Sequence, residues 1–313
     1  MTAPVAEGGD RRPRIWAVGG GKGGVGKSVL AVNLAATVAR RGLRVAVVDA
    51  DFGGANLHTL LGMSTTRRTI WDFLGRQLES LGEALVSTRI PGLFLVSGAR
   101  SHLEAGNPTH AQKCRLLRAL PGLEVDVVVL DLGAGTGFNV LDLFLVADRG
   151  LVVVVPEATS VENAYQFLKA TFLRMLKRAE PRDRVGEVMT TVLEAQGTGG
   201  VHSPRDLVAQ VLLADREVGS KLLAEAARFI PGLVVNRAQG PGDRQLGEDM
   251  ELACRDYFGS DLRLLGVIDE DPVVGRSVRD RTPAVELVPR SSFVVAVGEL
   301  AEVLTGREGP RAD

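Results

Sequence analysis

The sequence has little of several features that define common protein classes. Only two of its 313 residues are cysteines. Cys114 and Cys254 lie far apart and lack the C-x-x-C spacing of zinc and redox sites, so we expect a reducing compartment and no disulfide framework. Acidic and basic residues nearly balance, at a formal net charge of −1. The chain as a whole therefore has no strong attraction to nucleic acid or to an anionic membrane.

Long apolar stretches are also missing. The run Leu151–Val155 is far too short to cross a bilayer. The first residues, MTAPVAEGGDRRPR, are polar and lack the apolar centre of a signal peptide. We therefore expect a cytoplasmic protein.

Short, almost uninterrupted apolar runs are abundant. Such runs are typical of strands buried on both faces of a parallel sheet. They occupy residues 15–18, 45–48, 93–96, 125–130, 151–155, 233–235 and 264–267. Residues 27–42 and 160–180 between them have helical patterns, with Gly42 as a helix stop and Ser160 as a helix cap. This alternation predicts an α/β fold.

Residues 177–230 interrupt the alternation. They contain no strand-like run before Phe229, and we predict a helical excursion from the sheet. Its role is open between additional packing over the core and docking of a partner. We expect one domain over residues 14–305, with disordered tails at 1–13 and 306–313.

A glycine-rich loop carries the first chemical signal. Gly21 to Ser28 match the phosphate-loop pattern G-x-x-x-x-G-K-[ST], and the match lies between a predicted strand and a predicted helix. Glycines let backbone N–H groups curl around phosphate oxygens, and the helix N-terminus favours an anion. We expect Lys27 to bind the β- and γ-phosphates of ATP and the Ser28 hydroxyl to bind Mg²⁺.

A phosphate loop needs only one lysine, but this one also contains Lys22. The sequence GKGGVGKS resembles the deviant Walker A motif of the MinD/ParA family, which includes the flagellar-number regulator FlhG and the nitrogenase iron protein. The resemblance covers about residues 14–305. It implies a three-layer P-loop NTPase fold, with a mostly parallel twisted sheet flanked by helices. It also implies a homodimer that encloses ATP, in which Lys22 reaches the phosphates bound by the other subunit, as an arginine finger does.

Two further strand ends carry aspartates that match the family. Asp49 and Asp51 in DADFGGANLHTLLG correspond to its magnesium-side and water-positioning carboxylates, and Asn56 falls on its asparagine. This D-x-D-x-G-x-x-N pattern is closer to MinD and FlhG than to ParA. The resemblance also makes Asp131 the second magnesium-side carboxylate. It places switch II at Gly133, Ala134 and Gly135.

The base site is expected after a later strand. In the family an asparagine here bonds the adenine, and Asn236 matches it, although a turn-forming role for Asn236 is an alternative. Residues 266–287 resemble the loop that closes over the base, with Asp269, Glu270 and Asp271. The predicted nucleotide contacts are Gly21, Gly23, Gly24, Val25, Gly26, Lys27, Ser28, Val29, Asn236 and Arg237. Lys22, Lys27 and Asp51 are the predicted catalytic residues.

These residues predict a slow ATPase that is stimulated by an activating protein partner. The favoured hypothesis is a dimerisation switch of the MinD/FlhG type, which positions or counts a division, flagellar or polar machine. The alternative is a ParA-like dimer recruited to nucleoid DNA, with a surface made by Arg276, Arg279, Arg281 and Arg290.

An iron–sulfur carrier is disfavoured because the cluster cysteines are missing. A metabolic ligase is disfavoured because it has no use for Lys22. Membrane attachment through the C-terminus is not expected, because that end has no basic amphipathic helix.

Overall fold

A single eight-stranded sheet forms the centre of the computed structural model, which describes residues 12–64, 66–99, 107–178, 187–189, 191–192 and 201–306. The strand order is β3-β4-β2-β5-β1-β6-β7-β8. The strands are β1 (Arg14–Gly19), β2 (Val45–Ala50), β3 (Leu85–Ser87), β4 (Leu93–Val96), β5 (Val127–Leu132), β6 (Arg149–Val154), β7 (Gly232–Ala238) and β8 (Arg263–Asp269).

Neighbouring strands are parallel throughout, apart from the antiparallel pair β3 and β4 at one edge. All seven predicted runs are strands, with ends that shift by no more than three residues. β3 is the strand that the sequence did not indicate. It has only three residues, none of them fully buried, and a short turn joins it to β4. An edge strand of this kind has no long apolar run to reveal it.

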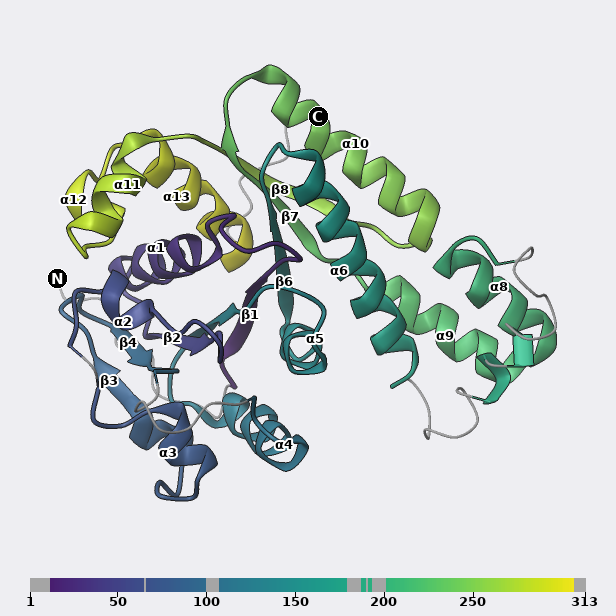
Figure 1. The fold of residues 1–313 in the computed structure, drawn as a ribbon, viewed down its shortest axis with the longest axis horizontal. Helices are drawn as coiled ribbons and strands as arrows, with labels where there is room; N and C mark the ends of the chain where they lie inside the picture. Colours follow the sequence, from purple (N-terminus) through teal and green to yellow (C-terminus); the bar gives the residue numbers. More distant parts are fainter. Residues whose placement is uncertain are drawn as a thin grey trace, which may run out of the picture.

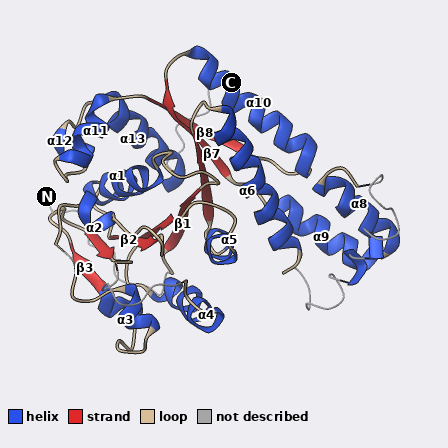
Figure 2. Ribbon diagram, viewed as in Figure 1, coloured by secondary structure: helices blue, strands red, loops and turns tan. Residues whose placement is uncertain are grey.

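Helices cover both faces of the sheet (Figures 1 and 2). They are α1 (Lys27–Arg40), α2 (Leu57–Leu60), α3 (Ile70–Leu74), α4 (His110–Ala119), α5 (Phe138–Leu145), α6 (Ala158–Leu176), α8 (Pro204–Ala214), α9 (Arg216–Arg228), α10 (Pro241–Phe258), α11 (Pro272–Arg279), α12 (Ala284–Leu287) and α13 (Ser292–Thr305), with 3-10 turns at Leu81–Ala84 and Leu120–Gly122. The predicted cap Ser160 lies inside α6, where its hydroxyl accepts a hydrogen bond from the Val155 N–H at 3.1 Å. That helix begins two residues earlier than predicted.

Side chains of each strand alternate between two cores. Ile15 and Ala17 of β1 face the core under α4, α5, α6 and α10, and Trp16 and Val18 face the core under α1 and α13. Figure 1 shows α1, α11, α12 and α13 on one side of the sheet and α5, α6 and α10 on the other. The expected three-layer α/β fold with a mostly parallel sheet is confirmed.

The region of the predicted excursion contains α8 and α9, which pack beside α6. Residues 179–186, 190 and 193–200 of that region lie outside the described residues, as do 1–11 and 307–313 of the predicted tails. Within the predicted N-terminal tail, Arg12 pairs with Asp148 and Pro13 is buried. In the described part of the chain, no helix is both long enough and apolar enough to cross a membrane.

Candidate nucleotide-binding site

The predicted site residues gather at the carboxyl edge of the sheet. The phosphate loop follows β1, Asp51 follows β2 and the switch II glycines follow β5. Asp49 and Asp131 are paired in the register of the adjacent strands β2 and β5. Because β1, β2 and β5 are parallel, their loops converge on one crevice, where open α/β sheets bind ligands.

The backbone of the phosphate loop depends on its glycines. Gly24 and Gly26 have φ values of 78° and 94°, which L side chains rarely adopt. A Cβ on Gly21 would lie 2.0 Å from the carbonyl oxygen of Asn163 in α6. Around Gly23 and Gly24 no atom lies within 4 Å of a Cβ position, so the tip of the loop is open. The loop is therefore held tightly at its base, and its tip is free to receive a phosphate.

Lys27 lies at the centre of this loop, with only 7% of the residue exposed. Its Nζ donates a hydrogen bond to the Lys22 carbonyl oxygen at 2.9 Å. Burial lowers the pKa of Lys27, and the nearby carboxylates of Asp131 and Asp51 act in the opposite direction. The ammonium group is thus positioned against the loop before any anion arrives.

Asp49 and Asp131 form a buried acidic pair behind the loop. Neither Oδ atom of Asp131 has a hydrogen-bond partner, and the same is true of Oδ1 of Asp49. The other oxygen of Asp49 accepts the Leu57 N–H at 3.0 Å. Burial raises the pKa of Asp49 to about 6 and that of Asp131 to about 8. Unpartnered carboxylate oxygens beside the Ser28 hydroxyl are the hard donors that Mg²⁺ prefers, so these three residues fit that ion.

Asp51 lies directly against switch II. A Cβ on Gly133 would approach Oδ1 of Asp51 to 2.9 Å, and the same oxygen accepts the Gly53 N–H at 3.2 Å. Switch II also contacts the phosphate loop, because the Gly135 N–H bonds to the Gly20 carbonyl at 3.3 Å. Ala134 between the two glycines is exposed. The predicted water-positioning carboxylate and the predicted switch therefore lie side by side.

Lys22 points away from its own loop. Its Nζ contacts Oε2 of Glu157 at 2.5 Å and Oγ1 of Thr159 at 2.8 Å, both at the carboxyl end of β6. The hydrogen bond and the charge of Lys22 lower the pKa of Glu157. A third of the Lys22 side chain remains exposed. In this subunit, the two lysines of the loop are thus directed to different partners.

The predicted base contacts are only partly brought together. Asn236 is 7% exposed, and its Nδ2 donates to the Val25 carbonyl at 2.8 Å, so its amide N–H supports the phosphate loop. The side chain of Arg237 is exposed, and its φ is 57°. Asp271 caps α11 and binds Ser292 of α13 at 2.9 Å. Asp271 therefore joins two helices. The predicted family asparagine, Asn56, lies at the start of α2, where its side chain makes no capping hydrogen bond.

Glu157, Thr159 and Asn163 are site residues that the sequence reasoning missed. All three follow β6, which lies next to β1 in the sheet. The signal available was the position of Pro156-Glu157 directly after a buried run, because polar residues at that end of a parallel strand border the ligand crevice.

Replacing Lys27 with alanine is expected to weaken ATP binding about 10- to 150-fold, since a hydrogen bond to a charged group contributes about 1.5–3 kcal/mol. Titration with a fluorescent ATP analogue measures this change. Lys169→Ala, which removes an exposed lysine of α6, is the matched control and is expected to bind like the wild type. Equal affinity of the Lys27→Ala protein would contradict the assigned phosphate contact.

Comparison with known proteins agrees with this geometry. The family description "CobQ/CobB/MinD/ParA nucleotide binding domain" matches residues 16–284. The chain is similar to the antiactivator FleN of Pseudomonas aeruginosa, at 36% identity over 158 residues that cover 50% of this chain and 55% of FleN. It is also similar to the flagellum site-determining protein YlxH of Helicobacter pylori, at 29% identity over 49% of this chain and 52% of YlxH. The chain thus spans about half the length of these two relatives.

A solved structure extends the likeness to the whole fold. The septum site-determining protein MinD of Pyrococcus horikoshii, in complex with Mg-ADP, superimposes with a TM-score of 0.62 at 22% identity, covering 93% of this chain and 96% of MinD. The resemblance inferred from Lys22 and Lys27 is confirmed by the family match. The chain belongs to the CobQ/CobB/MinD/ParA family of nucleotide-binding domains.

Proposed function

We propose that the protein is an ATP-dependent dimerisation switch of the MinD/FlhG type, which hydrolyses ATP slowly under the control of a protein partner. The switch controls the position in the cell, or the number, of a division, flagellar or polar machine. The similarity to FleN and YlxH supports the flagellar form of this role. The activating partner is a protein that binds only one of the two oligomeric states.

The orientation of Lys22 is the observation that carries the proposal. Its ammonium group is held by Glu157 and Thr159, whereas that of Lys27 lies against the backbone of the phosphate loop. A lysine on the rim of the crevice, with a third of its side chain exposed, is placed to enter a site on a facing subunit. Such a cation would stabilise charge on the transferred phosphoryl group of the other copy.

We assign the other site residues roles that their contacts support. Lys27 and the loop backbone hold the phosphates, and Asn236 fixes the loop through the Val25 carbonyl. Asp51 orients the attacking water beside switch II. Ser28, Asp49 and Asp131 would hold Mg²⁺, which neutralises phosphate charge when bound. Loss of the γ-phosphate releases switch II and, with it, the subunit interface.

DNA binding by a ParA-like dimer remains the alternative function, but two of the four arginines suggested for it have partners within the subunit. The Arg281 guanidinium donates to the Met63 carbonyl at 2.8 Å, and Arg276 pairs with Asp280 at 3.3 Å. Co-sedimentation of the Asp51→Ala protein with DNA and with anionic vesicles, with and without ATP, separates the outcomes. We expect the protein to co-sediment with neither DNA nor vesicles. ATP-dependent co-sedimentation with DNA would favour the ParA-like function.

Lys22→Ala is expected to keep ATP affinity, because the Lys22 carbonyl that accepts from Lys27 is retained, and to lose ATP-dependent dimerisation, because the proposed contact across the interface is removed. Light scattering after size-exclusion chromatography measures the mass with and without ATP. Glu157→Gln is the complementary change: it removes the carboxylate that holds Lys22 within the subunit and is expected to leave dimerisation intact. Normal dimerisation and turnover by the Lys22→Ala protein would show that Lys22 has no role across the interface.

A further inference from the structure

We propose that residues 1–11 of this chain bind in a pocket at the amino-terminal edge of the sheet, between α5, α6 and α9. This pocket lies at the end of the sheet opposite to the nucleotide site, since β6 and β7 begin beside it. The inference concerns the chain's own N-terminal segment and does not depend on the proposed function.

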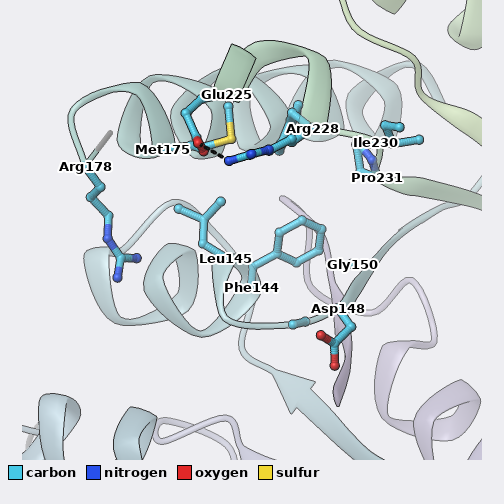
Figure 3. A pocket seen from close by; sticks show the side chains of 12 residues that line it. Phe144, Leu145, Asp148, Gly150, Met175, Arg178, Glu225, Arg228, Ile230 and Pro231 are labelled. Carbon is cyan, nitrogen blue, oxygen red and sulfur yellow. Dashed lines mark hydrogen bonds and ion pairs between the residues drawn. The ribbon is translucent and has the colours of Figure 1, made fainter. Parts of the chain in front are cut away.

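The pocket has a volume of about 410 Å³, and its lining combines apolar side chains with charged ones. Figure 3 shows Phe144 and Leu145 of α5 pointing toward the helices that carry Met175 and Arg228. Ile230 and Pro231, which precede β7, close another side. A pocket of this size and character fits two or three small apolar side chains.

The rim of the pocket carries both signs of charge. Arg178 and Arg228 lie at the rim, with side chains 47% and 75% exposed. Arg228 pairs with Glu225 at 2.7 Å, and Arg178 reaches Asp142 at 3.3 Å. Both guanidinium groups retain N–H donors for another carboxylate, because each has five.

The chain enters the domain at this same rim. Arg12, the first described residue, pairs with Asp148, which lines the pocket. The Ile15 N–H donates to Oδ2 of Asp148 at 2.8 Å, and the Asp148 N–H donates to the Ile15 carbonyl at 2.7 Å. Three contacts thus fix the start of the described chain against one residue of the pocket. The described chain therefore begins beside the rim of the pocket.

The length and composition of residues 1–11 suit this pocket. An extended segment of this length reaches about 36 Å, more than enough to cross the opening. Its sequence, MTAPVAEGGDR, has apolar residues at Met1, Ala3, Pro4, Val5 and Ala6, followed by the acidic Glu7 and Asp10. Apolar residues match the interior, and the two carboxylates match the arginines of the rim. Tethering beside the pocket gives the segment an effective concentration in the millimolar range, so it has an advantage over a free partner.

Disulfide trapping in the full-length chain tests the proposal. In a Cys114→Ser background, Val5→Cys is combined with Leu145→Cys inside the pocket or with Val303→Cys on α13. Val303 is exposed and lies near the same edge, where Arg14 bonds the Thr305 carbonyl at 2.9 Å, but on the opposite face of the sheet. We expect the Leu145 pair to form an intramolecular disulfide at least about ten times faster than the Val303 pair, because docking raises the local concentration.

Non-reducing electrophoresis and peptide mass spectrometry identify the products. Equal rates for the two pairs would overturn the proposal, and so would a disulfide that links two copies of the chain. A second measurement avoids cysteine altogether. Val5→Asp should accelerate hydrogen exchange in residues 225–231 relative to the wild type, and Gly9→Asp, outside the apolar stretch, should not. Unchanged exchange in the Val5→Asp protein would also refute docking.

Discussion

The Asp51→Ala protein should form a dimer with ATP that persists for the length of a chromatography run, with turnover reduced about 10²- to 10⁴-fold. Removing a group that positions or activates the attacking water has effects of that size. The carboxylate lies against switch II and the Gly53–Gly54 turn, so its loss should spare the backbone of the phosphate cradle. ATP binding and dimerisation should therefore survive while hydrolysis does not.

Light scattering measures the ATP-dependent dimer, and a phosphate-release assay measures turnover. Asp256→Ala, which removes an exposed carboxylate from α10, is the control and should behave like the wild type in both. A monomer that does not respond to ATP, or wild-type turnover, would show that Asp51 is not the water-positioning residue.

Asp142→Ala should destabilise the fold by about 3–5 kcal/mol, the usual cost of removing one partner from a buried ion pair. Asp142 is 2% exposed in α5 and receives Lys113 of α4, which is 4% exposed. Arg174 of α6 adds hydrogen bonds at 2.8 and 3.0 Å. Without the carboxylate, the Lys113 ammonium stays buried with no counter-charge. For a domain of this size we expect a fall in Tm of about 6–10 °C.

Calorimetry of the nucleotide-free protein measures the fall in Tm. The Lys113→Met/Asp142→Leu double variant is the control. The double variant removes both buried charges and should recover part of the stability that Asp142→Ala loses. A single variant that melts like the wild type would show that the pair contributes nothing to stability.

The stabilisation by Asp142 should also depend on pH. Burial opposes ionisation of Asp142, but hydrogen bonds from Arg174 and Lys113 outweigh it and hold its pKa below the usual range. Because the folded pKa is the lower one, the contribution is complete above the unfolded value of about 3.9 and is lost as the pH falls below it. The difference in stability between the wild type and Asp142→Asn should therefore shrink below about pH 4. A constant difference would refute this linkage.

Features that depend on neighbouring residues in the sequence were predictable. The phosphate loop needs glycines between a strand and a helix, and Asp49 and Asp131 each follow an apolar run, so their place at one edge follows from a parallel sheet. The fold class follows from the same runs.

Contacts set by strand order were not predictable in this way. Lys22 meets Glu157 across 135 positions because β1 and β6 are neighbours, and no local pattern specifies that pairing. Asn236 likewise donates its amide N–H to the Val25 carbonyl, 211 positions away, a contact that no local pattern indicates. No local pattern marks Asp142 as the centre of a buried ion cluster, because its partners come from two other helices.

The close packing of Gly21 against Asn163 has a mechanical consequence. Near its first turns α6 presses on the phosphate loop, and its last turn carries Met175 into the pocket at the other edge of the sheet. Its 19 residues form a rod about 28 Å long. Over that length, a tilt of about 2° displaces the far end by about 1 Å. A displacement of the loop that tilted α6 would therefore also change the shape of the distant cavity.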